Sequence, residues 1–92
     1  MTINNVLNDQ KGSFEAISEG VTAGLITYVF VGDDKFIIDH TEVSPDFNGQ
    51  GVGKKLILAA VDYARENNFK IIPLCPFAKS VFDKNEDLND VL

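Results

Sequence analysis

Several residue types are scarce in this sequence, and each scarcity excludes a class of protein. One cysteine, Cys75, allows no disulfide within the chain, and with one histidine, His40, it is too little for a four-ligand structural zinc site, so we expect no metal. The lone free cysteine fits a reducing cytoplasm, where we expect the protein to reside. No apolar run approaches the roughly 18 residues that span a bilayer, and the first residues lack the basic start and apolar stretch of a secretory signal.

Basic residues are also few: 8 Lys and Arg stand against 14 Asp and Glu, a net charge of −6. Residues 1–50 carry this whole excess, whereas residues 51–92 are balanced. Nucleic acid binding relies on a basic surface and is therefore disfavoured, and we expect no membrane partner. An acidic surface suits a cationic acceptor, but it more often serves only solubility, and both interpretations stay open.

The length of 92 residues, with 45% hydrophobic and 24% charged residues, is typical of one globular domain, which we place at residues 1–92. Residue alternation and turn residues predict four strands in the first half. These strands are expected over residues 3–8, 13–18, 21–31 and 35–43. In the fourth strand, alternation predicts Phe36, Ile38, His40 and Glu42 on one face and Ile37, Asp39, Thr41 and Val43 on the other.

A helix is predicted over residues 51–67, because apolar residues recur every four positions from Val52 to Ala64. The short apolar segment that follows predicts a buried parallel strand at residues 70–75, and Pro76 opens a second helix that ends near residue 84. The strand–helix–strand step should be a right-handed crossover. The predicted fold class is therefore α/β (α+β), with antiparallel strands, a crossover and a C-terminal helix around a mixed sheet.

Three alternating glycines, Gly49, Gly51 and Gly53, lie where the loop meets the first predicted helix, and Lys54 and Lys55 follow them. Glycines let backbone N–H groups approach an anion, and the helix dipole adds positive potential. The pattern predicts an anion site; a flexible loop that only caps and packs the helix is the alternative. A P-loop would need Gly at position 48 and Ser or Thr at 55, and the dinucleotide fingerprint would need Gly at 54, so neither motif matches.

The segment Asn48–Gly53 resembles the acyl-CoA motif Gln/Arg-x-x-Gly-x-Gly/Ala of the GCN5-related N-acetyltransferase (GNAT) superfamily. Gly51 and Gly53 match its glycines, and Asn48 replaces the leading Gln or Arg. The segments His-Thr-Glu-Val at residues 40–43 and Pro-Leu-Cys-Pro-Phe at residues 73–77 resemble those of the minimal GNAT-like proteins. The resemblance covers about residues 20–85, with the three motifs in the right order and spacing.

This resemblance implies a GNAT-like fold and a site for acetyl-CoA (CoA) as co-substrate. In the superfamily, backbone N–H groups of the glycine loop bind the pyrophosphate. The pantetheine arm runs in a cleft between the strands on either side of the helix, here residues 35–43 and 70–75. Carried over to this sequence, the expected CoA-binding residues are Val43, Asn48, Gly49, Gln50, Gly51, Val52, Gly53, Lys54 and Lys55.

Cys75 and His40 are the candidate catalytic residues. Cys75 follows a predicted strand and precedes the helix opened by Pro76, where free N–H groups stabilise a thiolate; a small buried hydrophobe is the alternative. His40 shares the predicted strand face with Glu42 and could act as a base, or could be only a hydrogen-bonded strand residue.

The sequence thus predicts an N-acetyltransferase that moves acetyl from acetyl-CoA to an amine, either directly or through an acetyl group on Cys75. The acceptor, a small molecule or a polypeptide, is not readable from the sequence, and neither is the oligomeric state. The alternative function is a non-catalytic module that binds or senses CoA.

Overall fold

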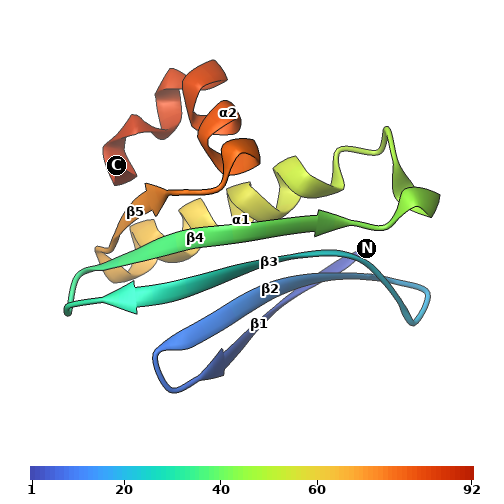
Figure 1. Cartoon of the computed structure of the whole chain (residues 1–92), viewed down its shortest axis with the longest axis horizontal. Helices are drawn as coiled ribbons and strands as arrows, with labels where there is room; N and C mark the ends of the chain where they lie inside the picture. The colour runs from blue at the N-terminus through green and yellow to red at the C-terminus, as the bar shows by residue number, and fades with distance from the viewer.

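Five strands form a single mixed sheet in the computed structural model, which describes residues 1–92. The strands follow one another across the sheet in chain order; the first four are antiparallel, and the fifth is parallel to the fourth. Their bounds are Thr2–Asn8 for β1, Lys11–Ser18 for β2, Val21–Val31 for β3, Lys35–Val43 for β4 and Lys70–Pro73 for β5. Figure 1 shows the meander of β1 to β4 and the short β5 beside the first part of β4. The predicted mixed sheet and parallel crossover are confirmed.

Helix α1 (Val52–Asn67) forms the crossover between β4 and β5. Its apolar stripe is buried against the sheet, which explains the four-residue recurrence in the sequence. The helix begins after Gly51, whose φ of 70° is left-handed. It ends at Asn68, which has a φ of 57° and whose N–H donates to the carbonyl oxygen of Ala64.

Helix α2 (Pro76–Lys84) follows β5 with the bounds that the sequence predicts. Two short 3₁₀ helices, η1 (Pro45–Phe47) and η2 (Glu86–Val91), were not predicted from the residue pattern. Because η2 buries Leu88 and Val91 in the core, the acidic tail is part of the fold. None of the helices is both long and apolar enough to cross a membrane.

An ion pair fastens η2 to α1. The Arg65 guanidinium donates to both carboxylate oxygens of Asp90, at 2.9 and 2.8 Å, and to the carbonyl oxygen of Asp87 at 3.0 Å. These hydrogen bonds from Arg65 hold the pKa of the Asp90 carboxyl below its usual value. Because both side chains are exposed, this ion pair contributes little to the free energy of unfolding, and its main effect is to orient η2 against α1.

Tyr28 of β3 lies at the centre of the core between the sheet and α1. Its buried ring contacts Phe14, Phe30, Phe36 and Tyr63, with ring centroids 4.8 to 6.2 Å apart. Its hydroxyl donates to the side-chain oxygen of Asn5 in β1, so the one polar atom of this side chain is satisfied. These contacts tie β1, β2, β4 and α1 to one ring. Phe69 contacts Phe30, Phe36 and Tyr63 and is the sixth ring of this aromatic cluster.

The predicted alternation along β4 is wrong beyond Ile38, because the strand contains a β-bulge. Thr27 pairs with His40 and Tyr28 with Ile38, so Asp39 has no partner in the ladder. The Thr27 hydroxyl donates to the Asp39 carboxylate at 2.6 Å and holds the extra residue outward. A bulge reverses which residues face each side. Thr41 and Val43 therefore share the helix side with Phe36 and Ile38, whereas His40 and Glu42 lie on the opposite, outer face.

Alkaline unfolding should report on Tyr28. Burial raises the pKa of Tyr28 from 10.0 to about 12, so above pH 10 the unfolded chain loses this proton before the folded chain does. Stability from this group is complete below pH 10 and falls by about 2 kcal/mol as the pH rises towards 12. Urea unfolding at pH 8, 10 and 11 should show a steeper loss in the wild type than in Tyr28→Phe. Parallel pH dependences in the two proteins would contradict the assignment.

Candidate functional site

The candidate site begins where β4 and β5 separate. Their parallel ladder runs from the pair Lys35 and Lys70 to the pair Ile38 and Pro73, where it stops. At its end, the carbonyl oxygen of Ile38 accepts from the N–H groups of both Leu74 and Cys75, at 3.0 and 3.1 Å. The chain then leaves the sheet and enters α2, while β4 continues alone to Val43. Figure 1 shows this divergence of β4 from β5 and α2.

Cys75 lies at this branch point as the N-cap of α2. Its sulfur accepts from the backbone N–H of Ala78 at 3.4 Å, and no other helix has a side-chain bond at its N-cap. The Thr41 hydroxyl is 3.2 Å from the same sulfur, and either atom can donate. Because the β4 bulge turns Thr41 to the helix side, this contact depends on the extra residue at position 39. The side chain of Cys75 is nearly buried, at 8% exposure, beneath the first turn of α2.

The glycine loop presents the N-terminus of α1 without a side-chain cap. The first intrahelical bond runs from the N–H of Lys55 to the carbonyl oxygen of Gly51 at 3.0 Å, so the N–H groups of residues 52–54 have no partner in the chain. Gly49 and Gly51 both have positive φ, at 79° and 70°, and their missing side chains would meet no atom within 4 Å. The loop thus offers bare backbone donors that any larger residue would screen.

Gly53 has a different role, which is to admit an aromatic ring. A Cβ at this position would lie 2.6 Å from the ring of Phe77. Phe77 belongs to the first turn of α2, so this contact places the N-terminal ends of α1 and α2 next to each other. Neither helix has an acidic residue in its first turn. Two positive helix-dipole ends therefore converge on one place in a protein whose net charge is −6.

An open hollow of about 430 Å³ lies between the glycine loop and α2. It is lined by Val43, Phe47, Asn48, Gly49, Gly51, Val52, Gly53, Lys54 and Phe77. Seven of these residues are among the predicted CoA-binding set. Gln50 and Lys55 of that set are exposed and do not line it, because Lys55 is already one turn into the helix. The amide donors and Lys54 suit phosphate, and the rings suit an apolar chain.

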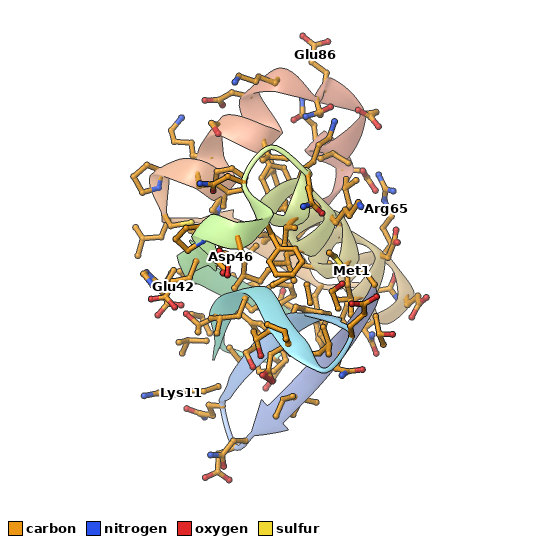
Figure 2. All side chains as sticks on the ribbon, turned by 90° about the vertical axis from the view of Figure 1, so that its right-hand side faces the viewer. Met1, Lys11, Glu42, Asp46, Arg65 and Glu86 are labelled. Atoms are coloured by element: carbon orange, nitrogen blue, oxygen red, sulfur yellow. The ribbon has the colours of Figure 1, made fainter.

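His40 lies on the outer face of β4, and the structure does not bring it to Cys75. Its Nε2 is 3.0 Å from the carboxylate of Glu42, and both side chains are exposed. Figure 2 shows Glu42 projecting on the side away from Arg65 of α1. The side chain that lies beside the Cys75 sulfur is that of Thr41.

Sequence reasoning missed three residues of this site: Thr41, Phe47 and Phe77. Thr41 was placed on the wrong face of its strand, and no residue type in β4 signals the bulge. Phe77 is separated from the glycine loop by the whole of α1 and β5, but Gly53 gave a usable signal. Gly53 lies in the first turn of a helix and does not have a positive φ, so backbone conformation does not require glycine at this position. A glycine there indicates that another side chain packs against the helix backbone.

The comparison with known families agrees with this geometry. The GCN5-related N-acetyl-transferase family matches residues 13–91, which is most of the chain. The chain belongs to this family. Its GNAT fold is also that of a GCN5-like protein from Staphylococcus aureus whose solution structure is known. That structure has a TM-score of 0.70 at 43% sequence identity, over 96% of this chain and 85% of the other.

Two further proteins are more distantly similar to this GNAT chain. Protein NATD1 of Xenopus tropicalis is 31% identical over 61 residues, which are 66% of this chain and 56% of that protein, so the chain matches little more than half of its length. An aminoglycoside N-acetyltransferase solved in complex with CoA has a TM-score of 0.60 at 23% identity. The match covers 84% of this chain and 67% of the other, and at this identity it shows a common fold.

The contact between Gly53 and Phe77 predicts a coupled effect on stability. In Gly53→Ala the new methyl group must displace the ring, which should cost about 1–3 kcal/mol, as overpacking does. In the Phe77→Ala background the ring is absent, and the same change should cost far less. Urea unfolding of the two single variants and the double variant measures this coupling. Additive effects would mean that the ring does not lie against position 53.

Proposed function

We propose that this chain is an acetyl-CoA-dependent N-acetyltransferase that uses the glycine loop to hold CoA and Cys75 to carry the acetyl group. The observation that supports this most is that the N-termini of α1 and α2 lie next to each other beside one hollow, which Phe77 of α2 lines and Cys75 does not. One end is bare and fits phosphate, and the other is capped by a cysteine sulfur. CoA has the same two parts, an anionic pyrophosphate and a thioester at the end of a flexible arm.

The residues of the hollow fit this co-substrate. The N–H groups of residues 52–54 and the charge of Lys54 would bind the pyrophosphate. The segment of β4 beyond Ile38 has lost its parallel partner, so its backbone would pair with the amides of the pantetheine arm. Val43 and Phe77 would contact the apolar parts of that arm. A protein with the same fold has been solved in complex with CoA, which supports CoA as the co-substrate.

Cys75 is the group proposed to react. Its deprotonated sulfur attacks the thioester carbonyl carbon, the carbon–sulfur bond to CoA breaks, and CoA leaves as a thiol that takes up one proton. An amine then attacks acetyl-Cys75, releasing an acetamide and regenerating the cysteine. The Ala78 N–H donates to the sulfur and the Thr41 hydroxyl can donate to it, so both would hold the attacking sulfur in place. Thr41 is therefore proposed as a positioning residue for Cys75.

The acceptor amine is proposed to enter from the outer face of the sheet. His40 is exposed there and paired with Glu42, so it stays a candidate base for the amine, with no contact to Cys75. Asp39 and Glu42 add negative charge on the same face, which suits a cationic acceptor. The acceptor's identity is left to a screen of amines and peptides against acetyl-CoA.

A CoA-binding module without catalysis is the second candidate. It is favoured by one observation: the sulfur of Cys75 is nearly buried and already engaged by Ala78 and Thr41, with no histidine or carboxylate beside it. Such a module would keep the glycine loop and bind CoA, but would form no acetyl-cysteine.

Binding of CoA is tested with two glycines that match in conformation. Gly51 and Gly20 both have positive φ and both have open space around a Cβ, but Gly20 lies in the turn between β2 and β3. Gly51→Val should weaken CoA binding at least tenfold, about 1.4 kcal/mol, because the side chain screens the helix N-terminus. Gly20→Val should bind as the wild type does. Amide chemical shifts during a CoA titration measure both, and unmoved amides at residues 48–55 would place the site elsewhere.

The role of Cys75 is tested by intact mass after mixing with acetyl-CoA. An acetyl adduct is expected in the wild type and is expected to be absent in Cys75→Ala, whose CoA affinity should stay unchanged. Thr41→Val should slow adduct formation at least tenfold through the lost hydrogen bond to a charged sulfur, and Thr41→Ser should restore it.

The acetyl adduct could be too short-lived to observe by mass. The rate of alkylation of the Cys75 thiol, measured as a function of pH, is therefore a second test of its reactivity. Thr41→Val should alkylate more slowly than Thr41→Ser at neutral pH. If the Cys75 thiol is alkylated only when the protein unfolds, the catalytic role of Cys75 is wrong, and the result favours the CoA-binding module without catalysis.

A further inference from the structure

Strand β1 is one edge of the sheet, and half of its backbone groups have no partner. The strand pairs only with β2, along its full length from Thr2 to Asn8. Six of its seven residues are exposed. Figure 1 shows β1 at the border of the sheet opposite to β5 and α2. An open row of N–H and C=O groups is a template for another strand.

This edge lacks the features that normally prevent such pairing. Natural edge strands are protected by charged side chains, prolines, bulges or a covering element. The first charged side chain in the sequence is that of Asp9, after the strand has ended, and β1 contains no proline. Its seven-pair register with β2 is unbroken, whereas the two following strand pairs each contain a bulge. Val6 and Leu7 are exposed on this regular, uncharged strand.

The sequence of β1 is complementary to itself when read in the opposite direction. In an antiparallel pair centred on Asn5, Ile3 faces Leu7 of the other strand on the helix side, and Asn4 faces Val6 on the outer side. Thr2 faces Asn8, so no charge faces a like charge. Such cross-strand pairs are the unit of sheet stabilisation.

We propose that β1 pairs with β1 of a second copy of this chain, so that one continuous sheet runs through a two-fold symmetric dimer. The same strand serves both copies, which is the isologous arrangement that closes at two subunits. The two-fold axis is perpendicular to the sheet, so α1 of each copy lies on the same side. Two chains of net charge −6 repel each other, and β1 is the uncharged region through which they can meet. The candidate site, at the opposite border, stays open.

The test compares two lysine substitutions at similarly exposed valines, with the mass of the protein in solution measured by sedimentation over a wide concentration range. Val6 of β1 is 47% exposed and Val21, at the start of β3, is 54% exposed. In the proposed dimer the two copies of residue 6 are diagonal neighbours about 7–8 Å apart. Val6→Lys should therefore raise the dimer dissociation constant at least tenfold, and Val21→Lys should leave it unchanged.

A charge-reversal pair completes the experiment. Val6→Glu alone should also weaken the dimer, and an equimolar mixture of Val6→Lys and Val6→Glu should restore it as a mixed dimer. Circular dichroism checks that each variant is folded. A wild type that stays monomeric at every concentration would overturn the proposal. So would a Val6→Lys protein that dimerises as well as Val21→Lys. Neither outcome would affect CoA binding, because the inference does not rest on the proposed function.

Discussion

The two hydrogen bonds accepted by the Ile38 carbonyl oxygen decide where the parallel ladder ends, and the site depends on that end. Pairing to Ile38 joins β4 and β5 through the core; beyond it, the bulge at Asp39 turns β4 so that Thr41 faces inward. After Leu74 and Cys75, the chain no longer pairs with β4, and α2 begins directly at Pro76. Cys75 is thereby held between a strand end and a helix start, by its backbone bond to Ile38 and by the contacts of its sulfur with Ala78 and Thr41.

Around this branch point, the small core relies on aromatic packing. Most of the sheet residues in the core come from one face of β2, β3 and β4. The ring of Tyr28 in β3 contacts rings of β2, β4 and α1. The close fit extends to glycine. A Cβ on Gly12 of β2 would clash with the Tyr28 ring, so this position of β2 must carry no side chain. The sheet that presents the site is thus fixed by contacts far from it.

The architecture was readable from the sequence because its signals are local. Alternation and turns gave four strands, apolar recurrence gave α1, and Pro76 gave the start of α2. The glycine loop was also found, since a helix start with three glycines has few structural uses. The bulge was not, because it arises from how β4 pairs with β3 and leaves no local pattern. That single extra residue moved His40 and Glu42 to the outer face and brought in Thr41. Phe77 was missed for a related reason, since its contact with Gly53 joins segments distant in sequence.

The connection between β4 and β5 differs from every other strand connection in the length of chain that it must close. Each antiparallel turn joins partners that are close in sequence, whereas Lys35 pairs with Lys70. Loop-closure entropy grows with the logarithm of loop length, so this pairing costs about 2 kcal/mol more to close than a tight turn. The meander can gain its local contacts first, and the crossover is the non-local step that limits how fast such a topology assembles. The branch point at Ile38 therefore exists only once the slowest contacts of the fold have formed, and a nascent chain has a sheet before it has a site.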